Sequence, residues 1–195
     1  MLKLFIPTYY YKSVYDIPLE ELYDKGIRLI LTDLDNTLIS YNDKMPNDKL
    51  NEFRDKVLSM GFELIIVSNS RKERVTNFAN AFNIPCVKFS TKPLKRGIKK
   101  AIKKVAKKKY NKNEIMIMGD QLMTDILGGN RCKINTCLIY PVDKSSEINV
   151  TKNNRRIEQF FLNRIRKRKK YKDTYLTLLK EFDEAKWLNV MVVDL

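Results

Sequence analysis

Between residues 28 and about 140, short apolar runs alternate with stretches of helical spacing, and this alternation limits the fold more than any other feature. The apolar runs predict strands over 28–34, 62–68, 86–89, 114–119 and 136–140. The stretches between them predict helices over 47–60, 71–82 and 94–110, with a short one near 123–127. Such alternation is typical of a doubly wound α/β fold with a mainly parallel sheet.

The pattern changes from Thr151 onward. Two helical pieces joined by a basic cluster, 164–170, are predicted there, and the final segment "WLNVMVVDL" is compatible with a terminal strand or a docking segment. We therefore expect residues 1–165 to form one α/β domain. Residues 166–195 are expected to be a basic, helical C-terminal extension packed on that domain.

The chain contains no histidine, which excludes several classes of site. Ser–His and Cys–His nucleophile pairs and imidazole zinc sites cannot form. The three cysteines lack a CxxC spacing, which argues against a disulfide framework or a thiolate zinc site. Acid–base chemistry must then come from residues such as Asp, Glu or Lys, and a metal should be a hard ion with oxygen ligands.

The net charge is +15, from 38 basic and 23 acidic residues. This excess indicates an anionic partner, either a membrane surface or nucleic acid, unless it reflects the Lys- and Asn-rich composition alone. No apolar run approaches the ~18 residues of a membrane-spanning helix. The N-terminal segment does not have the pattern of a signal peptide. We expect a cytoplasmic protein.

Reactive side chains follow each of the first four predicted strands. Because ligands in doubly wound folds bind beyond the carboxyl ends of the strands, these side chains should meet in one crevice. They include four carboxylates, one lysine and several hydroxyls, a set that suits phosphoryl transfer with a Mg²⁺ ion offsetting the carboxylate repulsion. The residues are Asp33, Asp35, Thr37, Ser68, Asn69, Ser70, Lys92, Asp120 and Asp125.

Each of these residues can be given a chemical task. Asp33 can attack phosphorus and form an aspartyl-phosphate. Asp35 can protonate the leaving oxygen and later take a proton from water. Ser68 and Lys92 can hold and neutralise the phosphoryl oxygens. Taken singly, each has a structural alternative, such as capping of the next helix by Asp120. Their joint occurrence, in order, favours the catalytic interpretation.

Four segments resemble the motifs of the haloacid dehalogenase (HAD) superfamily. "DLDNTL" is similar to its DxDxT motif, "IIVSNS" to its second motif, the pair Lys92-Pro93 to its third and "MIMGDQLMTD" to its fourth. The aspartate at position 35 resembles the pattern of the superfamily's phosphatases and phosphotransferases rather than that of its dehalogenases. P-type ATPases have threonine there.

The resemblance implies a HAD-type, Rossmann-like fold and a Mg²⁺-dependent phosphatase. It implies a role for each residue of the site. The catalytic residues would be Asp33 and Asp35, the phosphate ligands Ser68, Asn69 and Lys92, the metal ligands Asp33, the backbone carbonyl of Asp35, and Asp120, and the supporting residues Thr37 and Asp125.

A narrower resemblance covers residues 2–165. The segments "KLFIPTYYYKSVYDI", "GDQLMTDILGGNRCKINTCLIYP" and "NRRIE" are similar to the subclass IIIA group called YqeG, which includes phosphatidylglycerophosphate phosphatases. This resemblance implies hydrolysis of phosphatidylglycerophosphate to phosphatidylglycerol in phospholipid biosynthesis. The protein would then be peripheral at the inner face of the membrane and bind anionic phospholipid.

The spacing of the motifs leaves no room for a large cap domain. One helix and one strand use up each of the stretches from Asp33 to Ser68 and from Ser68 to Lys92. An open site suits a large substrate, such as a lipid headgroup at a bilayer, a protein or a nucleic-acid end. Two alternatives therefore stay open: a phosphatase of nucleic-acid ends or small soluble phosphoesters, and a non-catalytic module associated with RNA or the ribosome.

Overall fold

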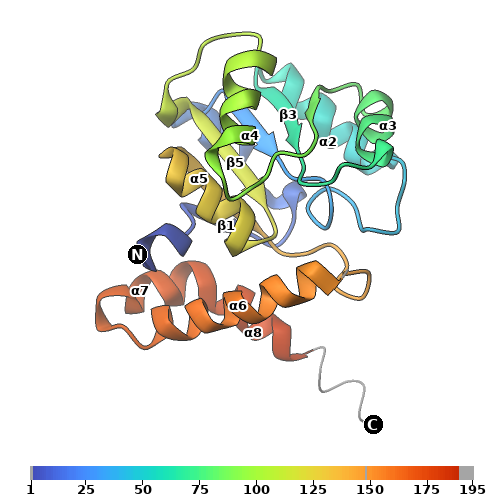
Figure 1. Cartoon of the computed structure of the whole chain (residues 1–195). Coiled ribbons are helices and arrows are strands. Elements are labelled where there is room, and N and C mark those ends of the chain that lie inside the picture. Colours follow the sequence, from blue (N-terminus) through green and yellow to red (C-terminus); the bar gives the residue numbers. More distant parts are fainter. Residues whose placement is uncertain (1, 148, 189–195) are drawn as a thin grey trace.

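The computed structural model describes residues 2–147 and 149–188, with side chains described as far as residue 184. Within these residues a six-stranded sheet forms the centre of the molecule, and all its strands are parallel (Figure 1). Its spatial order is β1-β6-β5-β2-β3-β4, which confirms the doubly wound fold. The strands are β1 (Tyr9–Tyr11), β2 (Leu29–Thr32), β3 (Glu63–Val67), β4 (Cys86–Val87), β5 (Ile115–Gly119) and β6 (Asn135–Ile139).

The helices that follow the strands cover both faces of the sheet (Figure 1). A short helix, α1, precedes β2, and two further short helices, α5 and α7, follow π-helical and 3₁₀ segments. The bounds are α1 (Leu19–Asp24), α2 (Asp48–Ser59), α3 (Glu73–Ala81), α4 (Lys95–Lys100), α5 (Leu127–Cys132), α6 (Asn149–Arg166), α7 (Lys172–Thr174) and α8 (Lys180–Leu188).

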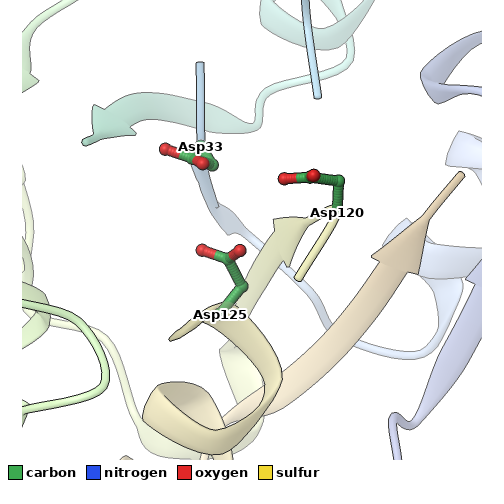
Figure 2. A group of neighbouring side chains, drawn as sticks. All are labelled: Asp33, Asp120 and Asp125. Carbon is green, nitrogen blue, oxygen red and sulfur yellow. The ribbon is translucent and has the colours of Figure 1, made fainter. Parts of the chain in front are cut away.

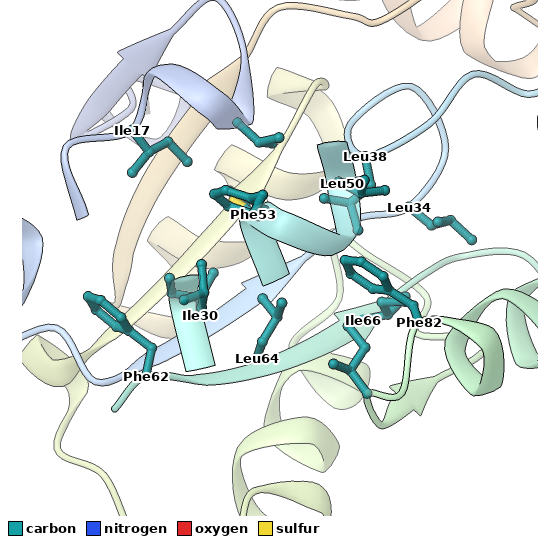
Figure 3. Close-up of a cluster of buried hydrophobic side chains, with 14 of the residues drawn as sticks. Ile17, Ile30, Leu34, Leu38, Leu50, Phe53, Phe62, Leu64, Ile66 and Phe82 are labelled. Atoms are coloured by element: carbon teal, nitrogen blue, oxygen red, sulfur yellow. The ribbon is translucent and has the colours of Figure 1, made fainter. Parts of the chain in front are cut away.

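Alternate residues of the central strands face opposite helical layers, as the two-residue period of a strand requires. Ile30 and Ile66 pack with the apolar residues of α2 and α3 in one core (Figure 3). Leu31 and Ile65 point to the other side, where Ile98 of α4 joins them in a second core. Because both faces are covered, the interiors of these strands are continuous apolar runs, with Thr32 at the end of β2 and Glu63 at the start of β3.

Strand β1 was not predicted from the sequence. Its three tyrosines are only partly buried, so it has no apolar run to reveal it. It is held as an edge strand beside β6, with Tyr9 opposite Cys137, and the Thr8 amide donates to the Thr136 carbonyl at 2.9 Å.

The lysine-rich helix is shorter than the predicted 94–110. It comprises α4 and a π-helical segment, Ala101–Val105, and the chain turns extended at Ala106. Glu63 then binds the following residues: it accepts from the Lys107 amide at 2.7 Å and from the Tyr110 hydroxyl at 2.9 Å. Since Glu63 begins β3, the last lysines of this segment lie at the amino ends of the strands. The expected site lies at the opposite, carboxyl ends.

The C-terminal region is helical, as predicted, with its break inside the basic cluster. Helix α6 ends at Arg166, and α7, a π-helical segment (Tyr175–Leu179) and α8 return along it (Figure 1). Leu162 of α6 and Phe182 of α8 belong to a third core, which also contains Phe5 and Leu122. The segment predicted as a strand or a docking segment covers residues 187–195. Its first two residues end helix α8, and residues 189–195 lie outside the described part of the chain. Among the described residues, no helix is both long and apolar enough to cross a membrane.

Candidate active site

The end of β2 places Asp33 and Asp35 beside one another. Strand β2 is fully buried, and the Asp33 amide continues its ladder by donating to the Met118 carbonyl of β5 at 2.9 Å. Leu34, between the two aspartates, is buried in the core with α2 and α3. Because side chains alternate along extended backbone, the aspartates on either side of Leu34 both reach the carboxyl ends of the strands.

Lys92 lies between two of the predicted carboxylates. Its Nζ is 2.9 Å from Oδ1 of Asp33 and 2.7 Å from Oδ1 of Asp125. Burial alone would lower the pKa of the Lys92 ammonium, but the two carboxylates outweigh burial and raise it. Lys92 therefore remains a fixed positive charge in the site.

Asn69 holds the backbone of Lys92 in place. Its Oδ1 accepts from the Lys92 amide at 2.7 Å and from the Ser90 hydroxyl at 2.7 Å, and its Nδ2 donates to the Lys92 carbonyl at 2.9 Å. The side chain predicted to bind phosphate is thus engaged in positioning Lys92. Ser68 precedes it at the end of β3, is buried, and accepts from the Ser70 amide at 3.1 Å.

Three buried carboxylates converge at this end of the sheet (Figure 2). Asp33, Asp120 and Asp125 each offer an oxygen, and these oxygens lie within 4.8 Å of one another. Thr37 donates to Oδ1 of Asp120 at 3.4 Å. Burial raises the pKa of Asp33 to about 7 and that of Asp120 to about 8, against the opposing effects of Lys92 and Arg155. Loss of hydration, the first cause of both pKa shifts, is therefore only partly offset by the neighbouring side chains.

The charges of the site leave a deficit of cations. Within the described part of the chain, its ion pairs join the carboxylates of Asp33, Asp35, Asp120, Asp125 and Glu147 to three cationic side chains, those of Lys92, Arg74 and Arg155. An oxygen-only donor set with excess negative charge is what a hard divalent cation such as Mg²⁺ requires. The residues present therefore fit the predicted metal.

Arg74, at the start of α3, was not predicted as a site residue. Its guanidinium pairs with the Asp35 carboxylate and donates to the Ser40 carbonyl at 2.9 Å and to the Asp43 carbonyl at 2.6 Å. Arg74 therefore fixes both the orientation of Asp35 and the loop that follows it. The resemblance to the superfamily motifs gave no signal for it, because Arg74 lies between the second and third motifs.

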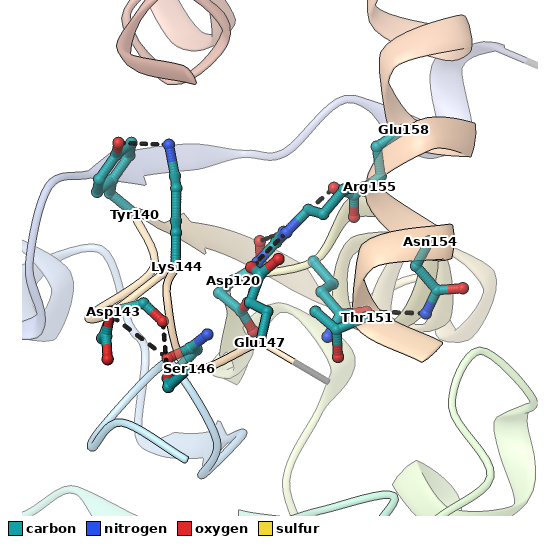
Figure 4. Close-up of polar contacts among 12 residues, drawn as sticks. Asp120, Tyr140, Asp143, Lys144, Ser146, Glu147, Thr151, Asn154, Arg155 and Glu158 are labelled. Atoms are coloured by element: carbon teal, nitrogen blue, oxygen red, sulfur yellow. Dashed lines mark hydrogen bonds and ion pairs between the residues drawn. The ribbon is translucent and has the colours of Figure 1, made fainter. Parts of the chain in front are cut away.

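Arg155 of α6 is the second residue that the motifs missed (Figure 4). Its guanidinium pairs with the Asp120 carboxylate and donates to the Asp120 carbonyl at 2.6 Å. It also contacts Glu147 at 2.8 Å and Glu158 at 3.1 Å. These carboxylates raise the pKa of Arg155 although burial opposes them. The segment "NRRIE" contained the signal, since both Arg155 and Glu158 come from it.

Six of the predicted residues open into one cleft of about 280 Å³, whereas Thr37, Asp120 and Asp125 are buried and do not line it. No cap is inserted between β2 and β3 or between β3 and β4, as predicted, but the first turn of α6 forms one wall. There Thr151 Oγ1 lies 2.9 Å from the Tyr41 hydroxyl, and Asn154 donates to Gln121 Oε1 at 2.9 Å. The lining residues are Asp33, Asp35, Tyr41, Ser68, Asn69, Ser70, Lys72, Arg74, Lys92, Gln121, Thr124, Val150, Thr151 and Asn154.

Comparison with known proteins gives one family, one similar curated protein and several solved structures. The family described as mitochondrial PGP phosphatase matches residues 2–143. The chain is also 32% identical, over 166 residues, to "Probable phosphatase YqeG" of Bacillus subtilis (strain 168); the match covers 85% of this chain and 94% of that protein.

Two solved structures are also among the matches. The cobalt-bound form of deoxy-D-mannose-octulosonate 8-phosphate phosphatase from Haemophilus influenzae is 10% identical with a TM-score of 0.47, over 71% of this chain and 89% of that one. A Legionella pneumophila protein described as a HAD superfamily (subfamily III A) hydrolase is 14% identical with a TM-score of 0.43, over 81% and 93% of the two chains. The sequence motifs and the sheet topology are those of a HAD-type phosphatase, and the match over residues 2–143 shows that the chain belongs to the family described as mitochondrial PGP phosphatase.

Proposed function

We propose that this HAD-type phosphatase is Mg²⁺-dependent and converts phosphatidylglycerophosphate to phosphatidylglycerol at a membrane surface. The observation that carries the proposal is the cluster of Asp33, Asp120 and Asp125 around Lys92, in a cleft without an inserted cap. A terminal phosphate can enter such a cleft while the rest of a lipid stays outside. The match to the family described as mitochondrial PGP phosphatase supports this choice of substrate.

In the first step, a carboxylate oxygen of Asp33 attacks phosphorus. The bond between phosphorus and the glycerol oxygen breaks, and Asp35 donates its proton to that oxygen. Lys92 neutralises charge on the phosphoryl oxygens, together with Ser68. In the second step, Asp35 takes a proton from water and the water oxygen attacks phosphorus. The bond between phosphorus and the Asp33 oxygen breaks, and inorganic phosphate is released.

The metal would be held by Asp33, Asp120 and the backbone carbonyl of Asp35, with Asp125 and Thr37 beside it. When bound, Mg²⁺ supplies the positive charge that lets a phosphate dianion approach three carboxylates. Arg155 keeps the Asp120 carboxylate facing this cluster, and Arg74 keeps Asp35 in its orientation. These two arginines are positioning residues in the proposal.

The test is phosphate release from vesicles that contain phosphatidylglycerophosphate. Release should require Mg²⁺, stop on chelation, and be lost in Asp33→Asn. Asp48→Asn, which removes an exposed carboxylate at the start of α2, is the matched control and should behave like the wild type.

The same assay distinguishes the two alternatives. A protein that releases phosphate from a soluble aryl phosphate or a 5′-phosphorylated oligonucleotide, and none from the lipid, contradicts the lipid assignment while leaving the phosphatase intact. A protein that releases no phosphate from any of the three, with Mg²⁺ present, supports the non-catalytic module instead.

A further inference from the structure

The outer face of α6 carries large apolar side chains that no other described residue covers. Val150, Ile157 and Phe160 are 67%, 44% and 52% exposed. Val150 and Ile157 are two helical turns apart and Phe160 follows three residues later, so all three lie on one side of the helix. We call these three residues the outer stripe.

The outer stripe begins inside the catalytic cleft. Val150 lines that cleft together with Thr151 and Asn154 of the same helical turn. From Val150 to Phe160 the helix rises roughly 15 Å, at about 1.5 Å per residue. The stripe therefore connects the site of chemistry to a surface more than two turns away.

At its other end the stripe enters an apolar groove of about 390 Å³. Phe161 stacks on Phe5 with ring centroids 3.9 Å apart, which fixes an aromatic wall of the groove. Arg164 lies over the ring of Phe160, 4.5 Å from its centroid. The described residues that line the groove include no acidic side chain; they are Leu2, Phe160, Phe161, Arg164, Arg168, Lys170 and Tyr171.

The exposed charged side chains of α6 are basic. The single acidic residue within Asn149–Arg166 is Glu158, which is buried and engaged by Arg155. Lys152, Arg156 and Arg164 are all exposed. Apolar and aromatic side chains bordered by Lys and Arg, without exposed carboxylates, are the pattern of a helix that lies in the interface of an anionic bilayer.

We propose that the outer stripe and the adjoining groove dock the protein on an anionic phospholipid bilayer, so that the cleft faces the headgroups. Ile157 and Phe160 enter the interface, while Arg164, Arg168 and Lys170 contact lipid phosphates. The inference deepens the proposed function and rests on it only for the identity of the substrate. The aliphatic side chains of the stripe favour a lipid surface. Stacking of nucleic-acid bases would need free aromatic rings, but in the groove Phe161 already stacks on Phe5 and Arg164 lies over Phe160.

The lysine-rich segment after α4 supplies a matched comparison. Lys108 and Lys109 are exposed and follow Lys107, which is held at the amino ends of the strands by Glu63. A bilayer bound there would lie at the amino ends of the strands, at the opposite end of the sheet from the cleft. General attraction of a basic protein to an anionic surface would use these lysines as well as the basic side chains of the groove.

The experiment measures co-sedimentation of the full chain with vesicles of phosphatidylcholine, with and without phosphatidylglycerol. The wild type should bind only the anionic vesicles. We expect Ile157→Ser/Phe160→Ser and Arg164→Gln/Arg168→Gln each to weaken that binding about tenfold or more, because each removes half or more of one class of contact. Lys108→Gln/Lys109→Gln, which removes the same charge, should bind within about twofold of the wild type.

Two further measurements separate docking from folding and from chemistry. All three double variants should hydrolyse a soluble phosphomonoester at the wild-type rate and melt at a similar temperature. Equal binding of the α6 variants and the wild type, or an equal loss in the lysine control, overturns the docking proposal even where the lipid is hydrolysed. Vesicle binding that depends on α6, in a protein that hydrolyses only soluble esters, retains docking and rejects the proposed substrate.

Discussion

At the scale of single residues, the site depends on a close contact between Gly119 and the side chain of Asp125. Gly119 ends β5 directly before Asp120. A Cβ atom at this position would lie 2.2 Å from Cγ of Asp125 and 2.4 Å from its Oδ2. Contacts under 3.0 Å force one partner to move, and Asp125 is the partner that contacts Lys92. Glycine is therefore needed here for space rather than for backbone conformation.

Gly119→Ala should disable the site without changing any reactive group. Displacement of Asp125 removes one of the two carboxylates that hold Lys92, and a shift of about 1 Å at a catalytic group can lower the rate about 100-fold. We expect kcat to fall by about that factor, measured with a soluble phosphomonoester.

Gly128→Ala is the matched control. A Cβ atom there would meet Cδ1 of Ile98 at 3.0 Å, the far end of a side chain that can adjust. Its kcat should stay near the wild-type value. Wild-type kcat in Gly119→Ala would mean that Asp125 can move without effect, and would remove it from the supporting residues of the site.

At the scale of elements, the largely buried side chain of Arg155 connects α6 to the cluster of buried carboxylates. Arg155 pairs with Asp120, Glu147 and Glu158, and all three carboxylates are largely shielded from water. Removing one partner of a buried ion pair leaves charge without compensation, which costs about 3–5 kcal/mol. Arg155→Ala should therefore lower the free energy of unfolding by about that amount, measured by urea denaturation.

Arg156→Ala removes the neighbouring arginine, which is exposed, and is the control. We expect its free energy of unfolding to change by less than about 0.5 kcal/mol. Arg155→Lys keeps one charge but loses the planar fork that meets three carboxylates, so its stability should lie between the two. Equal stability of the Arg155→Ala and Arg156→Ala variants would contradict the role of Arg155 as the link to α6.

The sequence predicts elements that have a local pattern, and it does not predict contacts between residues that are distant along the chain. Five of the strands were predicted because burial on both faces makes them continuous apolar runs, and the reactive residues directly after those strands were predicted with them. Arg74 and Arg155 were not predicted, because an ion-pair partner can come from any helix that passes close enough in three dimensions. The predicted helix 94–110 was too long for a similar reason: Glu63, distant in sequence, binds Lys107 and Tyr110 and ends it.

At the scale of the whole molecule, the third core joins the N-terminal 3₁₀ turn and helix α8 to the segment that contains Asp125. It contains Phe5 from the N-terminal 3₁₀ turn, Leu122 and Ile126 from the segment that positions Asp125, and Phe182 from α8. Phe182 packs edge-on against Tyr10 and Tyr140, with ring centroids 6.1 and 6.3 Å away. We propose that the C-terminal extension unfolds together with the catalytic part of the chain rather than as a separate unit.

Phe182→Ala tests this cooperativity. Loss of a buried phenylalanine typically destabilises a core by about 3–5 kcal/mol, because a cavity replaces its contacts. Since the core includes the segment around Leu122, far-ultraviolet circular dichroism and phosphomonoesterase activity should be lost in one transition, shifted to lower temperature in the variant. Leu176→Ala, which truncates a half-exposed side chain of the same helical region, should shift both transitions only slightly. Two separate transitions in Phe182→Ala, with activity surviving the first, would show that the extension is an independent unit and that the site does not need it.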